Sequence, residues 1–309
     1  MSLRDHGRAV KEIVVRAFKK YGRDDPIQLA GTTAYFVIFA VAPILIIITS
    51  VLGLVIDEQT VSSKLFDEIN SLVGEQGGEF IQTLVQNFQE SERNVAGTII
   101  GVVVFLIAST TFFSVLQHNL NFIWRVRATP KSGVLKTLKD RLLSFGLILS
   151  LGFILLISLV IDAALAFFRD FLEGYVDRVT MYIIEPANFI VSFLVVVLVF
   201  ALIFKFLPDA KITWRVTWIG AIITAALFTI GKFIIGTVLA SANLDVMYGA
   251  AGSVVVLVLW VFYSSIILYF GAEVTQQFAH FYHHDIGPQE HAVKIAIQEV
   301  AEEEEESRA

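Results

Sequence analysis

The sequence predicts an all-α polytopic membrane protein with six transmembrane helices, cytoplasmic N and C termini, and amphipathic helices outside the bilayer. The 309 residues are 56% hydrophobic and only 17% charged, and the mean hydropathy is +0.71, which is typical of membrane proteins rather than soluble domains. Apolar runs such as residues 253–271 carry no charge at all, and roughly 20 such residues span the hydrocarbon core. Positive charges alternate between successive connections, which predicts the orientation.

Six apolar segments are long enough to cross a bilayer as helices, the conformation that satisfies every backbone group within one segment. They are residues 29–56, 95–116, 142–164, 189–206, 216–239 and 252–272. The first segment is long for one crossing and contains Pro43, so we expect a tilt or a kink there. The third is interrupted by Asp162 near its outer end.

Lys and Arg are concentrated in every second connection. The rich connections contain Arg4, Arg8, Lys11, Arg16, Lys19, Lys20 and Arg23; then Arg125, Arg127, Lys131, Lys136, Lys139 and Arg141; then Lys205, Lys211 and Arg215. The intervening connections contain only Lys64, Arg93, Arg169 and Arg178. Because cytoplasmic loops carry the excess of positive charge, both termini are expected in the cytoplasm.

Residues 1–28 are predicted to form an amphipathic basic helix before the transmembrane domain. Apolar side chains recur at helical spacing opposite a basic face: Val10, Ile13, Val14, Ala17, Phe18 and Tyr21. This pattern suits a helix that lies on an anionic cytoplasmic leaflet. The alternative is a polar leader helix that packs on neighbouring loops.

The six-helix transmembrane domain covers residues 29–282, and its external segment 57–94 is also amphipathic. Gly77-Gly78 is expected to break that segment into two helices, which form either an interfacial cap or a solvated connector. Residues 283–309 are predicted to be a cytoplasmic acidic tail, with a short helix on Val293, Ala296, Ile297 and Val300 before the charge run 302–306.

Two lines of polar residues follow helix faces inside the predicted membrane region. On the second span they are Thr110, Ser114, Gln117, Asn121 and Arg125; on the last span they are Ser265, Tyr269, Glu273, Gln276 and His280. Because lipid solvates such groups poorly, these faces should point to protein or water. Either the two lines enclose a cavity open to the cytoplasm, or they mark helix interfaces.

Two charged residues, Asp162 and Lys232, lie within apolar surroundings in the outer third of the bilayer. They either pair or bind an anion or coupling ion, or Lys232 extends its amine to the interface while Asp162 is interfacial. His280, His283 and His284 have spacing compatible with a metal, although the signal is weak without a Cys or carboxylate partner. No metal or other cofactor is therefore expected. The sequence has no cysteine, and the net charge of −6 argues against a nucleic-acid partner.

Several short motifs occur in order along the chain and together resemble the BrkB/YihY family of bacterial inner-membrane proteins. They are Ala34-Tyr35-Phe36, Ala42-Pro43, Phe204-Lys205-Phe206-Leu207-Pro208, Trp214-Arg215, Tyr248-Gly249, Trp260-Val261-Phe262-Tyr263-Ser264 and Gly271-Ala272-Glu273. The resemblance covers about residues 28–277 and implies a six-helix, multi-pass protein of the bacterial inner membrane. Members carry a ribonuclease BN-like label that is regarded as a misassignment, and some are linked to lipid or lipopolysaccharide export.

The leading hypothesis is a non-enzymatic transporter or flippase for a lipid or other amphiphile, with membrane lipids, anionic ones included, as its partners. No nucleotide-binding or hydrolase motif occurs in the sequence, so ATP hydrolysis by this chain is not expected. In this hypothesis Arg125 and Lys232 attract a phosphate and Glu273 gates or exchanges a proton. The alternative is a structural or regulatory membrane scaffold, and a membrane-bound ribonuclease is a remote third. The sequence does not indicate an oligomeric state.

Overall fold

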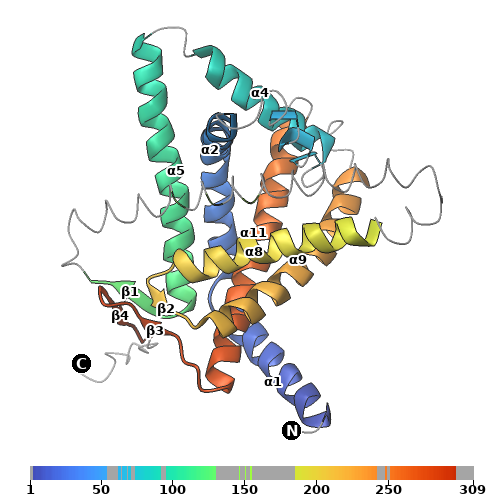
Figure 1. Cartoon of the computed structure of the whole chain (residues 1–309), viewed down its shortest axis with the longest axis vertical. Helices are drawn as coiled ribbons and strands as arrows, with labels where there is room; N and C mark the ends of the chain where they lie inside the picture. Colours follow the sequence, from blue (N-terminus) through green and yellow to red (C-terminus); the bar gives the residue numbers. More distant parts are fainter. Residues whose placement is uncertain are drawn as a thin grey trace, which may run out of the picture.

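In the computed structural model, the chain forms a bundle of long helices with short strands at one end (Figure 1). The structure describes residues 3–53, 62–63, 65–67, 69–70, 74–91, 95–129, 146, 150, 154, 185–241, 248 and 251–296. The helices are α1 (Leu3–Tyr21), α2 (Pro26–Gly53), α4 (Glu75–Ser91), α5 (Val95–Ile123), α8 (Glu185–Phe206), α9 (Trp214–Ser241) and α11 (Gly252–Phe281). The strands are β1 (Val126–Ala128), β2 (Ala210–Lys211), β3 (Gly287–Pro288) and β4 (Ala292–Lys294).

Four helices in the described part of the chain are long and apolar enough to cross a membrane. Their apolar stretches are Pro26–Ser50, Phe189–Phe206, Trp214–Val238 and Gly252–Phe281, which match the first, fourth, fifth and sixth predicted spans. Helix α5 covers the second predicted span and continues beyond it to Ile123. The third span falls almost entirely outside the described residues, although Gly146, Ser150 and Ile154 are helical.

Helix α11 is the centre of the bundle, because it packs against α1, α2, α4, α5 and α9. Its approach to α9 depends on glycine on both helices. A Cβ on Gly271 would lie 1.9 Å from Thr224 Oγ1, and a Cβ on Gly220 would lie 2.0 Å from Thr275 Oγ1. Each helix therefore places a threonine against a glycine of the other, a small-residue contact typical of membrane helices.

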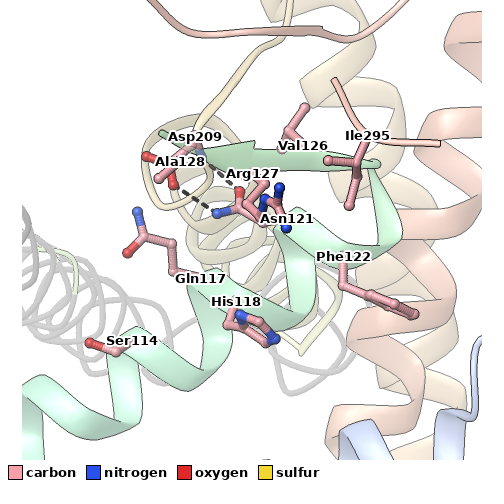
Figure 2. Close-up of a pocket in the computed structure, with 10 residues that line it drawn as sticks. All are labelled: Ser114, Gln117, His118, Asn121, Phe122, Val126, Arg127, Ala128, Asp209 and Ile295. Carbon is pink, nitrogen blue, oxygen red and sulfur yellow. Dashed lines mark hydrogen bonds between the residues drawn. The ribbon is translucent and has the colours of Figure 1, made fainter. Parts of the chain in front are cut away.

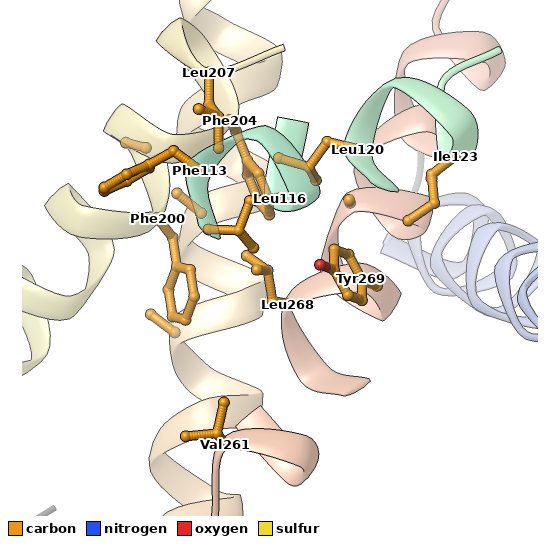
Figure 3. Close-up of a cluster of buried hydrophobic side chains, with 14 of the residues drawn as sticks. Phe113, Leu116, Leu120, Ile123, Phe200, Phe204, Leu207, Val261, Leu268 and Tyr269 are labelled. Atoms are coloured by element: carbon orange, nitrogen blue, oxygen red, sulfur yellow. The ribbon is translucent and has the colours of Figure 1, made fainter. Parts of the chain in front are cut away.

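The apolar core includes the half of α5 that leads into β1, packed with α8 and α11 and with residues of α2, α4 and α9. Figure 3 shows Phe113, Leu116 and Leu120 from α5 close to Phe200 and Phe204 from α8. Phe204 and Trp124 meet edge to face with ring centroids 6.0 Å apart. This packing holds the end of α5 against the bundle.

Helix α4 crosses the end of the bundle opposite the strands (Figure 1) and packs on α2, α5 and α11. Ile81 and Val85 are buried in that contact, so the α4 part of the external segment packs on the bundle. The predicted break at Gly77-Gly78 is wrong, since both residues lie inside α4. Gly74, which precedes the helix, has a φ of 84°. Gly78 has a different role: it lets the Asn70 side chain approach the helix closely, because a Cβ on Gly78 would lie 1.6 Å from Asn70 Oδ1.

The four strands form a base at the other end of the bundle. β1 pairs antiparallel with β4, with Arg127 opposite Val293, and β2 pairs antiparallel with β3. The helix predicted around Val293 is therefore wrong, because Ala292–Lys294 is extended. The reason is long-range: backbone groups of β1, after the turn that ends α5, are free to pair with this segment.

Helix α1 is confirmed as a helix, and one of its faces packs on α11. Ile13 and Ala17 are buried against Val274, and the Tyr21 hydroxyl donates to the Ile266 carbonyl at 2.9 Å. Burial raises the pKa of Tyr21, so the hydroxyl keeps its proton for this bond. The neighbouring face of α1 leaves Val14 and Phe18 exposed.

Candidate functional site

The last turn of α5 brings polar residues from distant parts of the chain together at the base. The Trp124 indole donates to the Ala272 carbonyl at 3.0 Å and fixes this turn to α11. Arg125 then takes a left-handed backbone conformation with φ of 56°. This conformation is uncommon for a residue with a side chain, and it turns the chain from α5 into β1.

Four charged side chains form a network beside this turn. Lys20 Nζ lies 2.8 Å from Glu273 Oε2, and Arg125 Nη2 lies 2.5 Å from Asp24 Oδ1. Glu273 is fully buried and Asp24 is 3% exposed. Lys20 also donates to the Ile123 carbonyl at 3.2 Å and to the Gln276 side chain. The network joins α1, the connection between α1 and α2, the end of α5 and α11, and its two carboxylates balance its two cations.

A cluster of neutral polar groups lies deeper in the bundle, between α2, α5 and α11. The Asn119 amide donates to the Tyr269 hydroxyl at 2.9 Å, to Thr33 Oγ1 at 3.2 Å and to the Leu29 carbonyl at 3.2 Å. Thr33 Oγ1 and the Tyr269 hydroxyl are 2.5 Å apart. All three side chains are buried, so this cluster fixes the relative position of three helices.

A third group centres on Asp209, which follows α8. Asn121 Nδ2 donates to Asp209 Oδ2, and the Asp209 amide donates back to Asn121 Oδ1, both at 2.8 Å. His291 Nε2 lies 2.7 Å from Asp209 Oδ1. This group connects α5, the α8–α9 connection and the segment between β3 and β4.

A pocket of about 260 Å³ opens beside this third group (Figure 2). It lies between the last turns of α5, strand β1 and the residue that follows β4. Its lining residues are Ser114, Gln117, His118, Asn121, Phe122, Val126, Arg127, Ala128, Asp209 and Ile295. Figure 2 shows the Arg127 side chain turned back toward the last turn of α5.

The structure separates the two polar lines that the sequence defined. On α5, Ser114, Gln117 and Asn121 line the pocket, Thr110 is half-buried one turn further along, and Arg125 belongs to the charge network. On α11, Tyr269 and Glu273 contact α2, α5 and α1 instead. The lining residues of this pocket include none from α11, so it differs from the cavity expected between spans two and six.

The remaining candidates lie apart from the base pocket. Lys232 is half-buried in α9, and its predicted partner Asp162 lies outside the described residues. His280 Nδ1 lies 3.1 Å from Asp285 Oδ1, and both side chains are exposed. His283 and His284 are exposed as well. The described residues contain no group of three or more His, Cys, Asp or Glu side chains placed to hold a metal.

Sequence reasoning missed six residues of the three groups: Lys20, Asp24, Thr33, Asn119, Asp209 and His291. Lys20 and Asp24 had a weak signal, since their i, i+4 spacing can place opposite charges together. Asn119 lies on a different face of α5 from the polar line, so periodicity alone did not select it. Asp209 and His291 acquire their roles only through contacts across more than 80 positions.

Long apolar helices, a buried polar interior and a polar base define a polytopic helical membrane protein. The chain belongs to the Virulence factor BrkB family, whose model matches residues 17–296. The resemblance seen in the sequence motifs is thereby confirmed.

Curated relatives carry the name UPF0761 membrane protein. The protein of Alcanivorax borkumensis is 27% identical over 281 residues, which cover 89% of this chain and 62% of the relative. That of Pseudomonas aeruginosa is 26% identical over 277 residues, covering 87% and 63%. That of Psychromonas ingrahamii is 26% identical over 254 residues and covers 80% of each chain. The chain thus spans less than two thirds of the first two relatives, and no solved structure matches it significantly.

Proposed function

We propose that this protein is a non-enzymatic transporter or flippase-like protein for a lipid or other amphiphile in the bacterial inner membrane, with both termini in the cytoplasm. The supporting observation is the base pocket together with the α5 polar line that leads away from it. Ser114 is exposed, Gln117 is half-buried, and both line the pocket. Polar side chains on a membrane-spanning helix are typical of substrate pathways.

The dimensions of the polar line fit a headgroup path. Thr110 and Asn121 are eleven positions apart on α5, which corresponds to about 16 Å along a helix axis. The hydrocarbon core is about 30 Å thick, so the line extends about halfway across. A headgroup that follows it exchanges water for hydroxyl and amide groups, while its acyl chains stay in the lipid.

Lipid scrambling in proteoliposomes tests this function. We expect the purified protein to exchange fluorescent lipids between leaflets faster than empty vesicles do. The double variant Ser114→Val, Gln117→Leu should reduce that rate at least tenfold, since about 1.4 kcal/mol of barrier corresponds to a factor of ten. Thr111→Val is the matched control, because Thr111 lies on α5 outside the pocket lining and bonds its own helix at Ile107.

A folded protein that moves no lipid faster than empty vesicles, across a panel of headgroups, would count decisively against transport. Equal scrambling rates for the double variant and the unchanged protein would show that the transport pathway does not follow the polar line of α5.

The scaffold alternative has its own support, because the polar residues of α11 are used in helix packing. Tyr269 and Glu273 are fully buried and hydrogen-bonded to neighbouring helices. If the protein acts by recruiting partners through its Glu-rich end, removing residues 297–309 should abolish function. A transporter should keep its rate after the same truncation, because those residues lie beyond the strands of the base.

A further inference from the structure

The two arginines at the end of α5 have different surroundings. Arg125 donates to Asp24 Oδ1 and to the Phe122 carbonyl, and its guanidinium carbon lies 4.9 Å from the centre of the Phe122 ring. Arg127 lines the pocket, and among the described residues its guanidinium has no carboxylate partner. The sequence hypothesis assigned phosphate attraction to Arg125, but the structure leaves Arg127 available for it.

The backbone of Arg127 is held in place by strand pairing. Arg127 lies opposite Val293 in the β1–β4 ladder, and the Ile295 amide donates to the Arg125 carbonyl at 2.8 Å. The backbone that carries the Arg127 side chain is therefore part of a paired strand. A planar guanidinium can donate two parallel hydrogen bonds to phosphate oxygens, which a lysine does not reproduce.

Asp209, the acidic residue in the pocket lining, already has partners at both carboxylate oxygens. Asp209 accepts from Asn121 at one oxygen and faces His291 at the other, and its side chain is only about 5% exposed. Repulsion between Asp209 and a bound anion is reduced by these partners. Gln117 and His118 add further hydrogen-bond donors to the lining. The Ser114 hydroxyl already donates to the Thr110 carbonyl at 2.7 Å.

We infer that this pocket binds a phosphate group, with Arg127 as the bidentate donor and the Gln117 amide as a further hydrogen-bond donor. In the membrane the phosphate would be that of a lipid headgroup, so this assignment rests on the proposed function and specifies its substrate class. The pocket volume of about 260 Å³ is below the roughly 300–1,000 Å³ of pockets that enclose a drug-sized ligand. It therefore accommodates a headgroup while the acyl chains remain outside.

Native mass spectrometry of the purified full chain in detergent tests the assignment. Three probes are added separately: phosphatidylglycerol, diacylglycerol with the same acyl chains, and soluble glycerol 3-phosphate. We expect phosphatidylglycerol to bind and the Arg127→Gln variant to bind it about tenfold more weakly, as for a lost hydrogen bond to a charged group. Arg127→Lys should recover only part of the affinity, and diacylglycerol binding should not depend on Arg127.

Lys211→Gln is the matched control. It removes one positive charge from the same end of the molecule, but Lys211 is exposed in β2 and is not part of the pocket lining. Equal loss in Arg127→Gln and Lys211→Gln would indicate general surface attraction and overturn the inference. Unchanged phosphatidylglycerol binding in Arg127→Gln, with an unchanged melting temperature, would overturn it as well.

The remaining outcomes distinguish the phosphate source from the proposed transport. If glycerol 3-phosphate binds in an Arg127-dependent manner and phosphatidylglycerol does not, the phosphate site stands and a soluble phosphate ester is its ligand. If phosphatidylglycerol binds through Arg127 but the protein does not scramble lipids, the site stands and the transport proposal fails.

Discussion

Lys20 Nζ and Glu273 Oε2 lie 2.8 Å apart although 253 positions separate the two residues in the chain. Lys20 belongs to the last turn of α1, and Glu273 is fully buried in α11. The Gln277 amide donates to the second carboxylate oxygen at 2.8 Å, so both oxygens of Glu273 have partners. This pair fixes the amphipathic helix to the central helix of the bundle.

Replacing Lys20 with Met should destabilise the fold, because it leaves the carboxylate of Glu273 buried without its cation. We expect a loss of about 3 kcal/mol in the free energy of unfolding, the lower part of the range for breaking a buried pair, since Lys20 is partly solvated. Unfolding in mixed micelles measures it. The double variant Lys20→Met, Glu273→Leu should recover most of the loss.

The pair between Arg16 and Glu12 provides the control for that experiment. It lies on the same helix at 2.5 Å, but both side chains are about half exposed. Glu12→Gln should change the free energy of unfolding by less than about 1 kcal/mol. If Lys20→Met lowers the free energy of unfolding as little as Glu12→Gln does, the Lys20–Glu273 pair contributes no more to stability than an exposed pair.

The Tyr269 hydroxyl is expected to stabilise the contact among α2, α5 and α11. Tyr269→Phe removes the acceptor for Asn119 and the partner of Thr33, and we expect a loss of about 1–2 kcal/mol in the free energy of unfolding. Tyr263→Phe on the same helix is the matched control. The Tyr263 hydroxyl has no hydrogen-bond partner among the described residues, so this change should cost no more than about 0.5 kcal/mol.

Two truncations should have different effects on stability. A chain that ends at residue 296 keeps β3 and β4 and should melt at the same temperature as the full chain. A chain that ends at residue 284 loses both strands, the His291–Asp209 contact and one wall of the pocket, so its melting temperature should fall. Melting curves of the two purified proteins compare them directly, and equal curves would contradict a structural role for the strands.

His291 should hold the C-terminal segment to the base through Asp209. His291→Ala removes a hydrogen bond worth about 1 kcal/mol, which corresponds to about a fivefold increase in the opened population. Limited proteolysis should therefore cut the segment about fivefold faster. Glu290→Ala is the neighbouring control, since the Glu290 side chain is 94% exposed. Equal cleavage rates in the two variants would exclude this role for His291.

Single cysteines can be placed freely because the natural sequence contains none. We expect Lys11→Cys on α1 and Glu290→Cys near β4 to react with an impermeant thiol reagent only from the cytoplasmic side. Gln82→Cys, on an exposed position of α4, should react only from the outside. Labelling of Lys11→Cys and Glu290→Cys from opposite sides would contradict the arrangement of α1 and the base; labelling of both from outside would reverse the predicted orientation.

The sequence by itself determined the helical membrane class and the family, because hydropathy and short motifs are local properties. The described spans agree with it within a few residues at most boundaries, and α1 was found where its periodicity predicted. Three members of the predicted polar line of α5, Ser114, Gln117 and Asn121, line one pocket, although it is not the cavity expected between spans two and six.

Only the tertiary structure decided what those residues contact. Arg125 acquires a carboxylate partner from the connection between α1 and α2, and Glu273 acquires an ammonium partner from α1. Val293 is extended because β1 lies beside it. Such contacts join positions far apart in the chain, and helical periodicity gives the face of one helix but not its neighbour. For that reason the sequence drew attention to Arg125, whereas the fold leaves Arg127 facing the pocket.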